Sequence, residues 1–111
     1  MAIAEPHKEE VRVYNVEDLI RQTFPENPDV MVRVANCESG LKQFTQNGQV
    51  VMSHTRDFGL MQINEKVWDV KAKELGLNYK NSLEDNLKMA RHIYDVQGKS
   101  AWVCYNKLKV V

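Results

Sequence analysis

Apolar residues recur every three or four positions over residues 15–24 and 27–40, with polar residues between them. That spacing is typical of a helix with one buried face, so two helices are predicted here. Glu38 falls in the last turn of the second one. This is an unusual place for a glutamate, because the dipole at the end of a helix repels negative charge. The residues typical of helix ends that bound both segments are Asn15 with Asp18, Pro25, Asn27, Pro28 and Gly40.

The pattern changes after the second helix. Residues 43–58 are mostly polar, and the dipeptide Asn47-Gly48 lies between short strand-like runs around Phe44 and at residues 50–52. An Asn-Gly pair between two such runs is the strongest short-range signal of a β-hairpin. We therefore predict a small hairpin at this place in the chain.

Helical spacing returns in the second half of the chain and predicts three more helices. The last of them is expected to contain Trp102, Cys104 and Leu108, with Trp102 in the core. The residues predicted to cap or close the three helices are Asn64, Gly76, Ser82 with Asp85, Gly98 and Ser100. The chain is thus predicted to be mainly helical, of the α+β class, with about five helices and one inserted hairpin. Residues 1–13 are expected to be a tail, and residues 14–111 a single domain.

Composition excludes several classes of function. Fifteen basic residues balance fifteen acidic ones, so the formal net charge is zero and the basic excess of a nucleic-acid binder is missing. No apolar run approaches the roughly 18 residues of a membrane span. The first ten residues lack the apolar segment of a signal peptide. Either a signal or anchor lies outside this sequence, or export uses another route. We expect a monomer.

Cofactor chemistry has no visible support in the sequence. The three histidines, His7, His54 and His92, do not have the spacing of a zinc site. No glycine-rich phosphate loop and no serine nucleophile motif is present. We therefore expect neither a metal nor an organic cofactor.

Two motifs in order resemble a known superfamily. The first is Cys37-Glu38-Ser39-Gly40-Leu41, and the second runs from Asp57 to Asn64 as Asp-Phe-Gly-Leu-Met-Gln-Ile-Asn. Together they resemble the lysozyme-like superfamily of c-type lysozymes, soluble lytic transglycosylases and small transglycosylases of secretion and conjugation systems. In these families a helix ends in Glu-Ser, a hairpin follows, and a Gly-Leu-Met-Gln-Ile segment lines the substrate cleft. The resemblance extends over roughly residues 15–108.

The resemblance also bears on the end of the chain. Cys37 and Cys104 could be two buried thiols or a disulfide on composition alone. A Cys-Glu-Ser motif with a late Trp-x-Cys is similar to resuscitation-promoting factors, which implies that the two cysteines pair in an oxidising compartment. Tyr105 and Asn106 resemble the Tyr-Asn pair of soluble transglycosylases, whose tyrosine faces the catalytic glutamate. Lys107 stands where those enzymes usually have a glycine.

The resemblance implies that Glu38 is a general acid whose pKa is raised by burial, as in lysozyme. Asp57 lies where c-type lysozymes carry their second carboxylate. It is either a catalytic nucleophile or charge stabiliser, or a turn residue that caps the hairpin. The residues expected to bind substrate are Ser39, Phe58, Gln62, Asn64 and Tyr105. Asn64 can also be a helix cap.

Three functions follow from these expectations. The first is a lytic transglycosylase that cleaves the β-1,4 bond between N-acetylmuramic acid and N-acetylglucosamine in peptidoglycan. The second is a true muramidase that uses Glu38 and Asp57 together. The third, from another class, is a non-catalytic module for wall binding or assembly, since fold alone does not imply activity. In each case the expected partner is the peptidoglycan glycan strand, and the expected location is outside the cytoplasm.

Overall fold

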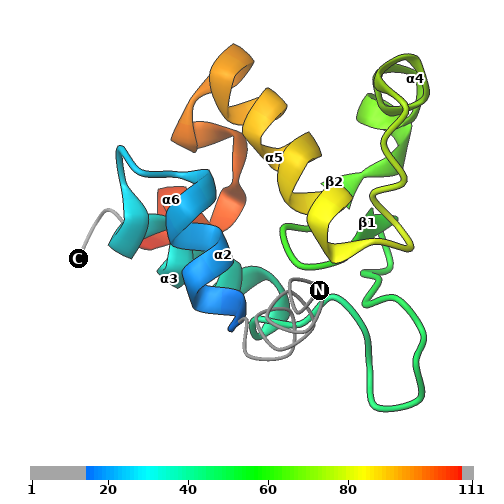
Figure 1. Ribbon diagram of the computed structural model, residues 1–111, viewed down its shortest axis with the longest axis horizontal. Coiled ribbons are helices and arrows are strands. Elements are labelled where there is room, and N and C mark those ends of the chain that lie inside the picture. Colours follow the sequence, from blue (N-terminus) through cyan, green and yellow to red (C-terminus); the bar gives the residue numbers. More distant parts are fainter. Residues whose placement is uncertain (1–14, 109–111) are drawn as a thin grey trace, which may run out of the picture.

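A computed structural model describes residues 15–108 (Figure 1), so the predicted tail at residues 1–13 lies outside the described residues. The described part is mainly helical, with five α-helices, one 3₁₀ turn and a two-stranded antiparallel sheet, which confirms the predicted fold class. In chain order the elements are α2 (Val16–Thr23), α3 (Pro28–Ser39), β1 (Asp57–Phe58), β2 (Ile63–Asn64), α4 (Glu65–Leu75), α5 (Leu83–Gln97), η1 (Lys99–Ala101) and α6 (Val103–Leu108).

Helix α5 lies between two halves of the fold, one formed by α2, α3 and α6 and the other by the two-stranded sheet and α4 (Figure 1). On one side it packs against α2, which contacts α3, and α3 in turn contacts α6. On the other side α5 contacts β2, which leads into α4. The core residues with the largest fully buried side chains are Phe24, Ile20, Met31, Leu60, Met61, Ile63, Met89 and Val34. None of the helices between residues 15 and 108 is long and apolar enough to cross a bilayer.

Three of the predicted N-caps form as expected, whereas Asn27 stands at the N-cap position of α3 without a capping bond from its side chain. The side chains of Asn15, Asn64 and Ser82 each accept a hydrogen bond from the backbone N–H three residues later. Gly40 and Gly76 close α3 and α4 with φ of +69° and +71°, a left-handed conformation in which glycine has no steric cost. Local sequence therefore determines these helix ends.

The predicted start of the last helix is wrong. Ser100 lies inside η1, and α6 begins only at Val103. Between them Trp102 adopts an extended conformation, with φ −100° and ψ 127°. Its indole is buried and donates a hydrogen bond to the carbonyl oxygen of Met61 at 2.8 Å. Because this contact holds Trp102 in the core, the helix cannot run through it.

The hairpin prediction is right about the turn and wrong about the strands. Gly48 has a φ of +84°, and the N–H of Thr45 donates to the carbonyl of Gln49 at 2.7 Å. Phe44 and Val50, however, form only an isolated bridge. The two-stranded sheet joins β1 to β2 instead. Phe44 is 39% exposed, so the first segment has little apolar surface to bury, whereas the side chains of β1 and β2 reach the core.

The predicted disulfide is present between Cys37 and Cys104, whose Cα atoms are 6.0 Å apart. It joins the last turn of α3 to the first turn of α6. Because the two residues are 67 positions apart, loop-closure entropy gives the bond a stabilising effect of about 4 kcal/mol. The bond therefore fixes the start of α6 beside the last turn of α3, where Glu38 follows Cys37.

Two buried amides hold the loop between β1 and β2. Gln43 is 3% exposed and Asn86 is fully buried, and both use their side chains to bind backbone groups of other segments. Gln43 accepts from the N–H of Leu60 at 2.8 Å, and Asn86 accepts from the N–H of Met61 at 2.9 Å. Asn86 also donates to the carbonyl of Phe58 at 2.9 Å. Buried amides that are fully paired in this way rigidify the chain around them.

The same two amides also hold the segment before α5. Gln43 donates to the carbonyls of Tyr79 and Lys80, at 3.0 and 3.1 Å, and Asn86 donates to the carbonyl of Tyr79 at 3.0 Å. No side-chain nitrogen or oxygen buried in the described part of the chain lacks a hydrogen-bond partner. The two amides thus connect three segments by hydrogen bonds: the loop at residues 58–61, the segment at residues 79–80 and helix α5, which contains Asn86.

Gly59 should be the most sensitive glycine in the chain. A Cβ atom at this position would lie 2.5 and 2.6 Å from the amide atoms of Gln43, and closer still to the amide nitrogen of Asn86, in a backbone with φ of +80°. We expect Gly59→Ala to lower the free energy of unfolding by more than about 2 kcal/mol, measured by urea denaturation, since overpacking adds to backbone strain.

Gly48→Ala is the matched control. Gly48 has a similar φ of +84° but no atom within 4 Å of its Cβ position, so this variant should lose only about 1 kcal/mol from backbone strain. Equal losses in the two variants would contradict the role given to the buried amides.

Candidate active site

Glu38 lies half-buried in the last turn of α3. The backbone N–H of Cys104 donates to its Oε2 atom at 3.2 Å. Cys104 is also the disulfide partner of Cys37, the residue that precedes Glu38. The carboxyl group is therefore held from two directions, by its own helix and by the start of α6.

Glu38 and Asp57 line the same pocket, although they are 19 positions apart in the sequence. The pocket has a volume of about 140 Å³, and its walls come from both halves of the fold. Ile63 of β2, Trp68 of α4 and Ile93 of α5 supply apolar surface, and η1 and the segment that begins α6 also line the pocket. The other lining residues are Gln62, Ile63, Asn64, Trp68, Ile93, Gln97, Ala101, Trp102 and Val103.

The pocket raises the pKa of Glu38. Burial is the largest cause, because it disfavours the charged form. The negative charge of Asp57 acts in the same direction, while the N–H of Cys104 and the positive charge of Lys107 oppose it. Glu38 therefore keeps its proton to a higher pH than an exposed glutamate does.

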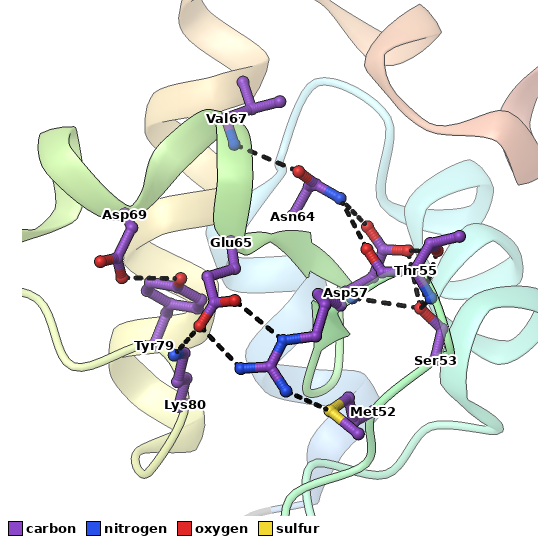
Figure 2. A network of polar contacts seen from close by, with 11 residues as sticks. Met52, Ser53, Thr55, Asp57, Asn64, Glu65, Val67, Asp69, Tyr79 and Lys80 are labelled. Atoms are coloured by element: carbon purple, nitrogen blue, oxygen red, sulfur yellow. Dashed lines mark hydrogen bonds and ion pairs between the residues drawn. The ribbon is translucent and has the colours of Figure 1, made fainter.

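Asp57 has the opposite environment, shown in Figure 2. Its Oδ2 atom accepts hydrogen bonds from the hydroxyls of Ser53 at 2.7 Å and Thr55 at 2.5 Å. Its Oδ1 atom accepts from the side-chain amide of Asn64 at 2.8 Å. Burial alone raises the pKa of Asp57, but the hydrogen bonds from Thr55, Asn64 and Ser53 and the positive charge of His54 outweigh it. The pKa of Asp57 is therefore lowered.

Two carboxyl groups with opposite pKa shifts in one pocket suit acid–base chemistry. Environments that push two pKa values apart separate a proton donor from a permanent anion. Glu38 can deliver a proton, and Asp57 can face a centre on which positive charge develops. No group of three or more His, Cys, Asp or Glu residues in the described chain is placed to hold a metal ion.

Asn64 and Gln62 reach the pocket as expected, but their amides are already engaged. The amide nitrogen of Asn64 donates to Asp57 and to the carbonyl of Thr55 at 3.2 Å, and its oxygen caps α4. Gln62 donates to the carbonyl of Gly59 at 3.0 Å and has a φ of +53°, which is uncommon for a residue with a side chain. Both residues therefore shape the pocket before any substrate binds.

Three predicted substrate-binding residues do not line this pocket. The hydroxyl of Ser39 donates to the carbonyl of Ala35 at 3.2 Å, inside α3. Phe58 is 4% exposed and packs in the core, with the ammonium of Lys80 4.6 Å from its ring centre. Phe58 therefore serves the core, although its neighbour Asp57 lines the pocket.

Tyr105 lies on a different face of α6 from the pocket. Val103 lines the pocket, and two residues further along a helix rotate the side chain by roughly 200°. Tyr105 instead lines a second hollow, formed with Val30, Arg33 and Leu108. The prediction that Tyr105 faces Glu38 is therefore not supported by this geometry.

Sequence reasoning missed the two hydroxyl residues that hold Asp57. Ser53 and Thr55 precede Asp57 by four and two positions, in a tight turn where short hydroxyl side chains often bind neighbouring groups. That spacing was the available signal. The apolar wall from α5, including Ile93, and the residues Ala101 and Val103 carried no local signal of a site.

No family model matches the chain, and searches of the curated proteins and of the solved structures return no match either. The resemblance to the lysozyme-like superfamily therefore stays a prediction from the two motifs.

The raised pKa of Glu38 has a consequence for stability. A folded state that binds its proton more tightly than the unfolded chain loses stability as the pH rises through the folded pKa. Glu38→Gln removes this titration and keeps an oxygen that can accept from Cys104. We expect Glu38→Gln to be more stable than the natural protein at pH 7, measured by urea denaturation.

The difference should vanish in acid, below the ordinary glutamate pKa of about 4.3, where Glu38 is protonated in both states. An unchanged or lower stability of Glu38→Gln at pH 7 would contradict the environment described for this residue.

Proposed function

We propose that this protein cleaves the β-1,4 glycosidic bond between N-acetylmuramic acid and N-acetylglucosamine in peptidoglycan, as a lytic transglycosylase. The observation that carries the proposal is the shared pocket of Glu38, with a raised pKa, and Asp57, with a lowered pKa. Glycosidic cleavage needs both a proton donor for the leaving oxygen and a stabiliser for positive charge on the sugar ring.

Glu38 is the proposed general acid. It donates its proton to the leaving oxygen, and the same carboxylate then takes a proton back as base. In a lytic transglycosylase that proton comes from the 6-hydroxyl of the muramyl residue, which closes a 1,6-anhydro ring. The raised pKa of Glu38 supports the first step, because an ordinary glutamate would be ionised at neutral pH.

The choice of peptidoglycan as substrate rests on the Cys37–Leu41 and Asp57–Asn64 motifs. The walls of the pocket are compatible with a sugar: Ile63, Trp68 and Ile93 supply apolar surface, and Gln97 is an exposed amide at its edge. Sugar rings combine apolar faces with polar edges, and aromatic and amide side chains suit both.

A muramidase is the second candidate, and the position of Asp57 favours it. An ionised carboxylate in the pocket could act as a nucleophile, so that water then releases a reducing end. Both candidates use Glu38 in the same first step, and they differ only in what attacks the sugar. Their products therefore distinguish them.

The deciding experiment is mass spectrometry of fragments released from purified peptidoglycan. The proposal expects muramyl fragments with 1,6-anhydro ends, whose mass is one water lower than that of reducing ends. Glu38→Gln should lower fragment release by about 100-fold or more, since general acid catalysis contributes about 10²–10⁴. Glu17→Gln, at an exposed position in the first turn of α2, is the control and should cleave normally.

Reducing ends would favour the muramidase. The absence of any fragment that depends on Glu38 would leave the non-catalytic wall-binding module as the better interpretation.

Asp57→Asn separates a supporting anion from a nucleophile. If Asp57 only stabilises charge, we expect a loss of about 100-fold in kcat, in line with the loss of one electrostatic stabiliser. The loss of a nucleophile would cost about 10⁴-fold or more. Steady-state release of fragments by the two proteins, together with their end groups, measures the difference.

A further inference from the structure

The segment from Ser53 to Asp57 is a closed turn. The N–H of Ser53 donates to the carbonyl of Asp57 at 3.0 Å, and the N–H of Arg56 donates back to the carbonyl of Ser53 at 3.1 Å. Arg56 has a φ of +66°, which is uncommon for a residue other than glycine and lets the turn close. The turn places two hydroxyl groups on one oxygen of Asp57 (Figure 2).

Both hydroxyls donate to the carboxylate, and their oxygens also lie 3.0 Å from each other. Ser53 Oγ accepts from the backbone N–H groups of Thr55 and Asp57, at 3.3 and 3.1 Å, and these N–H groups orient the hydroxyl that donates to Asp57. Thr55 Oγ1 donates to the same Oδ2 atom, and Asn64 donates to Oδ1. All three side-chain partners are donors, and a carboxyl can accept from all of them most fully when it is ionised.

The surrounding charges leave this anion without an ion pair. Glu38 lines the same pocket, and within the turn His54 acts on Asp57 as a positive charge. The guanidinium of Arg56 binds the carboxylate of Glu65 instead, at 2.8 and 3.0 Å. Among the described residues no lysine or arginine forms a salt bridge with Asp57.

Neutral donors have a different effect from a salt bridge. A lysine or arginine at Asp57 would favour the anion but would also cancel its charge in the pocket. Hydroxyl and amide donors favour the anion and leave its net charge intact, so that it can act on a positive centre nearby.

We propose that Ser53 and Thr55 are positioning residues that hold Asp57 as an immobile anion, without a lysine or arginine partner, for the reacting sugar in the pocket. The proposal rests on the proposed function, since it assigns a role within that pocket. It predicts that the two hydroxyls determine how far into acid the protein keeps its activity. It also makes Asp57 a stabiliser of charge, because three donors reduce the basicity of a carboxylate and so its strength as a nucleophile.

The test is a double variant, Ser53→Ala with Thr55→Val, measured in two ways. The first is NMR titration of the Asp57 side-chain carboxyl carbon, assigned by comparison with Asp57→Asn. We expect the titration of Asp57 to move to higher pH in the double variant. The second is the pH profile of fragment release. Activity at the acid end should fall about threefold to tenfold further than activity at pH 7 does.

Two further variants make the result specific. Thr45→Val with Ser100→Ala removes two hydroxyls from exposed positions elsewhere and should leave both measurements unchanged. Thr55→Ser keeps a hydroxyl at this position, so Asp57 should titrate in this single variant as it does in the unmodified protein. If the double variant does not fold, as judged by near-ultraviolet circular dichroism, Thr55→Val alone is measured in its place.

Each outcome decides the matter. A titration of Asp57 that does not move in the double variant overturns the proposal. A loss of activity that is equal at every pH also overturns it, because that is the effect of general damage to the fold. An upward movement of the titration in a protein that cleaves no peptidoglycan would support the hold on Asp57 and count against the proposed function.

Discussion

Two buried amides, those of Gln43 and Asn86, support the loop that connects β1 to β2. Six hydrogen bonds from them reach the backbone at residues 58–61 and 79–80, and none of these groups could be left unpaired in the core without a cost of about 1–3 kcal/mol. Gly59 lies against them, since a Cβ atom at this position would overlap both amides. Asp57 and Asn64 line the pocket and belong to the two strands that this loop joins. Their positions therefore depend on the two amides.

The pocket itself is a place where two physical effects act on two similar groups. Glu38 is mainly subject to burial, which the N–H of Cys104 and the positive charge of Lys107 oppose only in part, and its pKa rises. Asp57 is buried too, but three donors converge on its oxygens, and its pKa falls. The disulfide and the extended conformation of Trp102 bring the start of α6 to the pocket, so residues 101–103 form part of its wall.

Local features of the sequence were the most reliable guides to the fold. The caps at Asn15, Asn64 and Ser82 form within three residues, so a short window of sequence contains the whole interaction. Trp102 shows the limit of such reasoning. Its helical spacing was typical of a core position inside a helix, and it is a core residue, but its indole binds a carbonyl 41 residues away. That long-range contact outweighs helix propensity, which is worth less than about 1 kcal/mol per residue.

The sequence by itself determined the class of the fold, most of the helix ends and the prediction that Glu38 and Asp57 belong to one site. These follow from periodicity, capping and two motifs, all of which are readable along the chain. Only the tertiary structure decided that Phe58 and Tyr105 point away from the pocket and that Ser53 and Thr55 hold Asp57. Direction of a side chain depends on the rotation of each strand and helix against its neighbours, and packing between distant segments sets that rotation.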